Sequence, residues 1–313
     1  MGVWRAYFLS PKVRMNSNQY PFCQGPDPDP QKVKFKIPNG AVDCHAHIFG
    51  PESDYLYSPK RGYTPPDASL AEYLRVLQSL GGIRRAVLTQ PSVYGIDNSC
   101  MLDGVAKMGA AFRAVAAVDQ QMTDKELEEL HGQGVRGARV NLVDKGGMPF
   151  EDIAAVREFT ERIKHLGWHL EVLIHVHTFE DLRKTLNSMA VDVVVGHLGY
   201  MKTDIGIDHS GFQEFLELVH EGKCWAKLSG SYRIASSDWP PYKDVHPFAT
   251  ALVEANEERV IWGTDWPHPV FKGNMPNDGK LMDMLADWVS DERLRKKILV
   301  DNPETLYGFE PII

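Results

Sequence analysis

Three histidines and one aspartate stand at the ends of apolar, strand-like segments that are far apart in the chain. They are His45 and His47 in VDCHAHIFG, His197 in VDVVVGHLG and Asp265 in RVIWGTDWPHP. Each apolar run stops near the polar residue, and a loop with Gly or Pro follows. Imidazole and carboxylate groups that meet at one place can bind a divalent metal, or polarise a carbonyl group and activate water. The pattern therefore predicts an enzyme in which these four side chains are catalytic.

A second His-x-His pair, His175 and His177, occurs in LIHVHTFEDL. A catalytic zinc site has about three protein donors and one open position. One of these two histidines could therefore join His45, His47 and Asp265 as a metal ligand. The alternative is that His177 lies at the start of the next helix and contacts only backbone.

Side chains alternate between the two faces of a strand, so His45 and His47 share one face. The same alternation predicts that Asp43 faces the same way and orients an imidazole by hydrogen bonding. It also predicts that Cys44 points away from the two histidines.

Three basic residues follow strand-like segments: Arg139 in GVRGARVNLV, Lys145 in the next loop and Arg233 after KLSGSY. At the mouth of a barrel they would hold an anionic group, which a guanidinium can bind through two parallel hydrogen bonds. The alternative is that each pairs with a surface carboxylate.

Eight strand-like segments alternate with helical stretches, which is typical of a parallel sheet and gives the number of strands in a (β/α)8 barrel. In such a barrel the carboxyl ends of the strands converge on one mouth, where the chemistry takes place. The predicted strands are Ala41–His45, Arg85–Gln90, Phe112–Val118, Val135–Val143, His169–His175, Val191–His197, Cys224–Ser229 and Arg259–Asp265.

The helical stretches carry recognisable start signals. Ser69 with Glu72, and Thr123 with Glu126, are typical of capping boxes. Other predicted helices are Pro149 to about Leu166, Thr178–Met189, Ser210–His220, Val245–Ala255, Leu281–Val289 and Asp291–Val300, the last ending before Asn302-Pro303.

The 313 residues fit one barrel at 41–313, preceded by a Pro-rich extension at 1–40. The net charge of −8 argues against nucleic acid and anionic membranes as partners, because both require a basic surface. No segment approaches the length of a membrane span, and the apolar start of the chain is too short for a signal peptide. Four cysteines without regular spacing indicate reduced thiols and a cytoplasmic protein. A homo-oligomer is compatible with this sequence.

The order of these residues resembles the amidohydrolase superfamily, in its 2-pyrone-4,6-dicarboxylate lactonase-like branch. The similarity extends over roughly residues 40–310 and is most specific in AKLSGSYRIAS, RVIWGTDWPHP, MPNDGKLMDML and LVDNPETLYGF. It implies an α/β fold, a distorted (β/α)8 TIM barrel of the amidohydrolase type.

The resemblance also implies roles for individual residues. Asp265 matches the general base that activates water, and His45, His47 and His197 match histidines around a lactone carbonyl. The residues implied to bind substrate are Arg139, Lys145, Arg233, Tyr200, Tyr232 and His268. Lys145 and Tyr200 stand where the pyrone lactonase has arginines, and Leu173 replaces a tyrosine, so a different anionic lactone is expected.

The implied reaction is hydrolysis of an anionic lactone of the muconolactone type, with 4-sulfomuconolactone as the leading substrate. One Zn²⁺ ion is the expected cofactor, and a metal-free mechanism is the alternative. Other possible functions are a 2-pyrone-4,6-dicarboxylate or sugar-acid lactonase or isomerase, a zinc-dependent decarboxylase of an aromatic or muconic acid, and a barrel that only binds anionic ligands.

Overall fold

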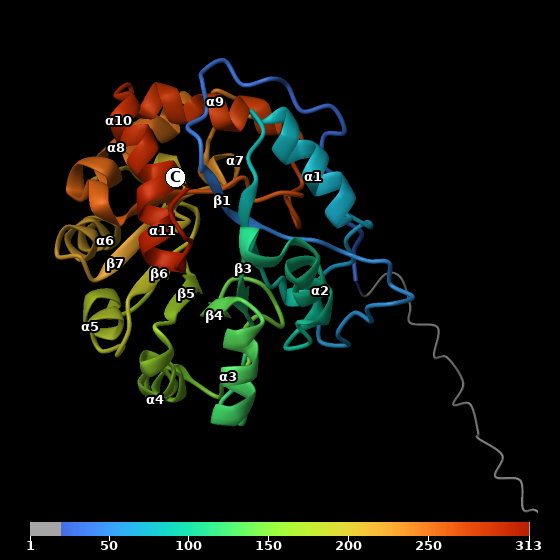
Figure 1. The fold of residues 1–313 in the computed structure, drawn as a ribbon. Helices are drawn as coiled ribbons and strands as arrows, with labels where there is room; N and C mark the ends of the chain where they lie inside the picture. Colours follow the sequence, from blue (N-terminus) through green and yellow to red (C-terminus); the bar gives the residue numbers. More distant parts are fainter. Residues whose placement is uncertain (1–19, 313) are drawn as a thin grey trace, which may run out of the picture.

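Eight parallel strands form a barrel with helices on its outside in a computed structural model, which describes residues 20–312 (Figure 1). The strands pair in sequence order from the first to the eighth. The ring closes where the amide of Asp265 donates to the carbonyl of His45, and that of His47 to the carbonyl of Trp266. The strands are β1 Val42–Ala46, β2 Arg85–Thr89, β3 Phe112–Ala116, β4 Val135–Asn141, β5 His169–Leu173, β6 Val193–Val195, β7 Cys224–Leu228 and β8 Val260–Trp262.

Every predicted strand segment contains the start of its strand, and the predicted (β/α)8 fold is confirmed. The reason is that strands covered on both faces read as nearly continuous apolar runs, which the sequence shows clearly. The helices are α1 Leu70–Ser79, α2 Ser99–Met108, α3 Asp124–Gly132, α4 Ile153–Ile163, α5 Leu182–Asn187, α6 Ser210–His220, α7 Ser231–Ile234, α8 His246–Ala255, α9 Asp278–Trp288, α10 Glu292–Lys296 and α11 Asn302–Tyr307.

Both capping boxes are present, at Ser69 and Thr123. Several helix ends differ from the prediction, and two of them have a clear local cause. Helix α4 begins after Asp152, whose side chain accepts the amide of Ala155, and not at Pro149. At the C-terminus the helix does not stop before Pro303, because a π-helical turn leads into α11 and Pro303 occupies its first turn, where a missing N–H needs no partner.

A β-bulge in β1 changes which side chains face the barrel interior. The register with β2 shifts between Asp43 and Ala46. On the amino-terminal side of the bulge, Cys44 packs in the barrel interior with Val42 and Val87. The carboxylate of Asp43 accepts a hydrogen bond from the hydroxyl of Tyr73 in α1, outside the sheet. On the carboxyl-terminal side of the bulge, His45 and His47 point inward. The expected positions of Asp43 and Cys44 were therefore wrong, because an extra residue reverses the alternation.

The amino end of the barrel is closed by apolar side chains. Tyr307 and Phe309, at the end of the chain, pack with the interior cluster of Val42, Val115 and Ile261. The guanidinium groups of Arg85 and Arg113 lie over the Phe309 ring, at 5.3 and 4.9 Å from its centroid. The predicted catalytic residues lie at the opposite, carboxyl end of the strands.

The described part of the predicted extension, residues 20–40, runs over α1 and α9 (Figure 1). Asn277 fixes it there by accepting the amide of Gln31 and donating to the carbonyl of Asp29. Gly279 permits this approach, because a Cβ at that position would lie 1.9 Å from the Gln31 carbonyl oxygen. Residues 1–19 of the extension lie outside the described residues.

All four cysteines are free and fall within residues 20–312. Over the same residues, no helix is long and apolar enough to cross a membrane.

Candidate active site

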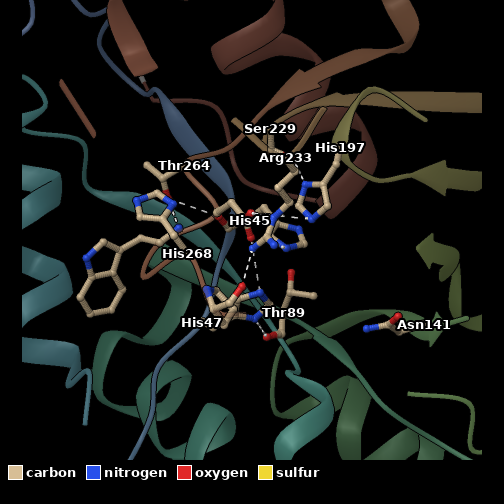
Figure 2. A network of polar contacts seen from close by, with 12 residues as sticks. His45, His47, Thr89, Asn141, His197, Ser229, Arg233, Thr264 and His268 are labelled. Carbon is tan, nitrogen blue, oxygen red and sulfur yellow. Dashed lines mark hydrogen bonds and ion pairs between the residues drawn. The ribbon is translucent and has the colours of Figure 1, made fainter. Parts of the chain in front are cut away.

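His45, His47 and His197 meet at the carboxyl end of the barrel (Figure 2), and the carboxylate of Asp265 lies among their rings. Nε2 of His45 and Nε2 of His47 lie 3.6 and 3.7 Å from Oδ1 of Asp265. Nε2 of His197 lies 3.8 Å from Oδ2 of the same carboxylate. All four side chains are buried, so the interactions among them are weakly screened by solvent.

The two oxygens of Asp265 have different surroundings. Oδ2 accepts hydrogen bonds from the hydroxyl of Tyr232 at 2.5 Å and from Nε of Arg233 at 2.6 Å. Oδ1 has no hydrogen-bond partner although it is buried. Burial opposes ionisation, but the Arg233 guanidinium and the nearby imidazoles hold the pKa of Asp265 well below its usual range. Asp265 is therefore a carboxylate with one oxygen held and one available.

The backbone at Asp265 is unusual. Its φ of 64° lies in the left-handed region, which costs energy for a residue other than glycine. Thr264 holds this turn, because its amide and hydroxyl donate to Asp43 and its hydroxyl oxygen accepts the amide of Trp266. Strain that the surroundings impose in this way is common at functional sites.

Each imidazole is fixed through its Nδ1 atom. Nδ1 of His47 donates to the carbonyl of Thr89 at 2.6 Å, and Nδ1 of His197 lies 2.9 Å from the hydroxyl of Ser229. Burial lowers the pKa of His47 and lowers that of His197 to about 3. Both rings are therefore neutral near pH 7.

His45 has charged neighbours at its Nδ1 atom. Nζ of Lys227 lies 3.1 Å away, and Oε1 of Glu171 lies 3.3 Å away. Lys227 and Glu171 form an ion pair of 2.6 Å. Burial lowers the pKa of His45 well below its usual range, and the Lys227 ammonium adds to that effect.

His45, His47 and Asp265 could hold a metal ion, because one donor atom from each lies within 4.8 Å of the others. Two of these atoms, Nε2 of His45 and Oδ1 of Asp265, are buried without a hydrogen-bond partner. The donor set of nitrogen and carboxylate oxygen suits a divalent transition metal.

The structure places His175 and His177 elsewhere. Nδ1 of His175 donates to the carbonyl of Tyr200 at 2.7 Å, and both rings line a pocket beside the site. Their expected role as metal ligands is not supported by this geometry.

That pocket has a volume of about 450 Å³ and a strongly basic wall. Within residues 20–312, no carboxylate contributes to this wall, although acidic residues outnumber basic ones in the chain. Arg233 belongs both to the wall and to the hydrogen bonds on Asp265, so the pocket opens directly beside the carboxylate. Its residues are His175, His177, Tyr200, Lys202, Arg233, Val270, Phe271 and Lys272.

Arg139 extends from β4 into the barrel, where it is buried with Nη1 lacking a hydrogen-bond partner. Lys145 is exposed in the loop after β4, and the structure does not bring it to the site.

Two residues predicted to bind substrate have a different position. Tyr232 donates to Asp265, and Nδ1 of His268 lies 3.1 Å from the Tyr232 hydroxyl. Nε2 of His268 lies 3.2 Å from Oδ1 of Asp278. Both rings are buried behind the carboxylate, so they support Asp265 and do not line the pocket.

Sequence reasoning missed Glu171 and Lys227. The signal was present, because each is a charged residue inside a buried apolar strand, HLEVL and CWAKL, where such residues are rare unless they are paired.

Known proteins are similar to this chain over most of its length. The amidohydrolase family model matches residues 42–309. The 2-pyrone-4,6-dicarboxylate hydrolase of Comamonas testosteroni is 38% identical over 292 residues, covering 91% of this chain and 95% of that protein. The 4-sulfomuconolactone hydrolase of Rhizobium radiobacter is 36% identical, covering 92% and 96%. An apo crystal structure from Agrobacterium tumefaciens has a TM-score of 0.81 at 30% identity, covering 90% of this chain and 100% of that one.

Proposed function

The chain belongs to the amidohydrolase family, and on that premise we propose that it hydrolyses the ester bond of an anionic lactone. The observation that carries the proposal is the free Oδ1 atom of Asp265, a buried carboxylate oxygen surrounded by neutral imidazoles. We take a muconolactone-type ring as the substrate and 4-sulfomuconolactone as the first compound to test. A 2-pyrone-4,6-dicarboxylate hydrolase and a 4-sulfomuconolactone hydrolase each align with nearly the whole chain.

Binding of the anion follows from the basic pocket. Lys202, Lys272 and Arg233 supply positive charge without an acidic residue in the wall, so a carboxylate or sulfonate group is attracted there. Arg139, with its unpaired Nη1, offers a second cation inside the barrel. Holding the anionic groups fixes the orientation of the lactone carbonyl over the histidines.

The chemical step begins at Asp265. Oδ1 accepts a proton from a water molecule, and the water oxygen attacks the ester carbonyl carbon. An imidazole N–H group at the mouth, from His45 or His197, donates to the carbonyl oxygen as it becomes negative. When the tetrahedral intermediate collapses, the bond to the ring oxygen breaks and the proton on Asp265 passes to that oxygen. One water molecule is consumed and the ring opens to a carboxylic acid.

A zinc ion is our proposed cofactor, and His45, His47 and Asp265 are the residues that would hold it. When bound there it would act as a Lewis acid toward the ester carbonyl and lower the pKa of water. The unpartnered His45 and Asp265 atoms support this fit.

The test is a panel of lactones with the purified protein, either loaded with zinc or treated with a chelator. The panel contains 4-sulfomuconolactone, 2-pyrone-4,6-dicarboxylate, a sugar-acid lactone and an uncharged lactone. We expect loss of ring absorbance and a product heavier by one water, with the uncharged lactone poorly used. A product lighter by carbon dioxide would indicate a decarboxylase, an unchanged mass an isomerase, and binding without turnover a binding protein; each would contradict the proposal.

Two further expectations concern the protein's setting. We infer a cytoplasmic location, which the four unpaired cysteines support. A homo-oligomer is compatible with the sequence, and the molar mass in solution would test it.

A further inference from the structure

A buried ion pair crosses the barrel interior beneath the site. Lys227 of β7 and Glu171 of β5 have side chains that are 0% and 2% exposed, and their charged atoms lie 2.6 Å apart. Removing two charges from water is costly, and pairing does not by itself make the exchange favourable. Neither residue lines the substrate pocket. Both members of the pair instead lie close to Nδ1 of His45, which is one of the predicted catalytic residues.

The two members of the pair require opposite protonation states of Nδ1 of His45. An ammonium group only donates hydrogen bonds, so a contact with Lys227 requires a bare, accepting Nδ1. A carboxylate only accepts, so a contact with Glu171 requires a protonated Nδ1. Nδ1 lies 3.1 Å from Lys227 and 3.3 Å from Glu171, so the contact with the lysine is the shorter one.

The choice at Nδ1 determines what Nε2 presents to the site. In neutral imidazole one nitrogen carries the proton and the other has a free lone pair. If Nδ1 accepts from Lys227, Nε2 is an N–H donor at 3.6 Å from Oδ1 of Asp265 and cannot bind a metal. If Nδ1 donates to Glu171, Nε2 has the lone pair that a metal requires.

His47 provides an internal comparison. Its Nδ1 lies 2.6 Å from the carbonyl of Thr89, which can only accept, so its Nε2 always has a free lone pair. The Nδ1 atoms of the two histidines in this His-x-His motif thus have different partners. A ligand imidazole is usually held in one tautomer by a carboxylate or carbonyl, and His45 has a competing cation there.

We propose that Lys227 and Glu171 are positioning residues that set the tautomer of His45, Lys227 favouring an N–H donor toward the substrate and Glu171 favouring a metal ligand. The pair thereby sets the zinc affinity of the site and the capacity of His45 to polarise a carbonyl without metal. This inference rests on the proposed function only in taking the site to be one that hydrolyses a lactone. The tautomer of His45 and the zinc affinity are both measured without substrate.

The first experiment measures zinc affinity in two variants by competition with a chromophoric chelator, and the tautomer measurement below separates the proposed effect from the direct attraction or repulsion between the changed charge and the ion. Lys227→Met leaves the carboxylate alone beside Nδ1, and we expect zinc to bind about tenfold more tightly. Glu171→Gln leaves the ammonium alone, and we expect binding to weaken by about tenfold. Opposite shifts cannot come from general loosening of the barrel, which would weaken zinc binding in both variants. Loss of affinity in both, or no change in either, would overturn the inference.

A second measurement needs no substitution, so a variant that fails to fold does not block the test. Nitrogen-15 NMR of histidine-labelled, metal-free protein distinguishes the two tautomers of a neutral ring. We expect His45 in the wild-type protein to carry its proton on Nε2 and His47 to carry its proton on Nδ1. A wild-type His45 protonated on Nδ1 would contradict the proposed dominance of Lys227. If no lactone is hydrolysed while the zinc shifts appear, only the proposed function fails.

Discussion

At the scale of single residues, the two oxygens of Asp265 have separate tasks. Tyr232 and Arg233 hold Oδ2, and Oδ1 remains without a partner. Burial raises the pKa of Tyr232 well above its usual range, with Asp265 adding to the effect, so Tyr232 stays a donor. The carboxylate is thus held in one orientation by groups that do not compete for its free oxygen.

Replacing Asp265 by Asn should therefore remove the base and leave most of the surroundings in place. We expect kcat for lactone hydrolysis to fall by about 10³-fold, within the range for loss of a general base. Tyr232→Phe is the matched control, because it removes one donor to Oδ2 and keeps the base, and a loss of about tenfold is expected. Circular dichroism would verify folding of both variants. Turnover of Asp265→Asn near the wild-type rate would exclude the assigned role.

The sequence predicted the four central residues because each ends an apolar segment at the same end of a parallel barrel. It did not separate His45 and His47 from His175 and His177, which repeat the same motif. Spacing shows that two histidines share a face of a strand, but it does not show whether they lie at the barrel axis or in the pocket wall. That difference depends on packing between segments distant in sequence.

At the scale of elements, Asp43 joins three parts of the fold that position the site. Its carboxylate accepts the amides of His45 and Thr264 and the hydroxyls of Thr264 and Tyr73. It thus links β1, α1 and the turn after β8 that carries Asp265. The β-bulge in β1 makes this possible, because it turns Asp43 outward and the next histidine inward.

Asp43→Leu should therefore destabilise the protein strongly without touching substrate. The amides of His45 and Thr264 would be buried without acceptors, which costs about 3 kcal/mol or more in the free energy of unfolding. Tyr73→Phe removes one hydrogen bond at nearly constant volume and should cost about 1 kcal/mol. Urea unfolding measures both values. Equal effects of the two substitutions would show that Asp43 does not act as the common acceptor.

The strands were predicted well because burial on both faces gives each one a long apolar run. The bulge in β1 was not predicted, because one extra residue does not change the composition of the segment. The position of the bulge depends on how β1 pairs with β2. Helix ends also depend on local hydrogen bonds, as the Asp152 cap shows, and α2 over Ser99–Met108 was not predicted at all.

At the scale of the whole molecule, the barrel has a polar mouth and a closed amino end, and both contain buried histidines. His169 lies near the amino end, 2% exposed, with its ring 5.2 Å from that of Tyr307. Neither of its ring nitrogens has a hydrogen-bond partner. Burial lowers the pKa of His169 to about 4.

The sign of the resulting pH effect follows from comparing the folded and unfolded chains. Below pH 6.5 the unfolded chain takes up a proton on His169, whereas the folded chain does so only near pH 4, so acid favours unfolding between these values. Between pH 7 and pH 5 the contribution of His169 is about 2 kcal/mol. In His169→Gln we expect the loss of unfolding free energy over this interval to be smaller by that amount. His45, His47 and His197 add loss of the same sign, so the variant should remain acid-sensitive. Urea unfolding at the two pH values measures the difference, and an identical loss in wild type and variant would show that His169 is not held neutral by burial.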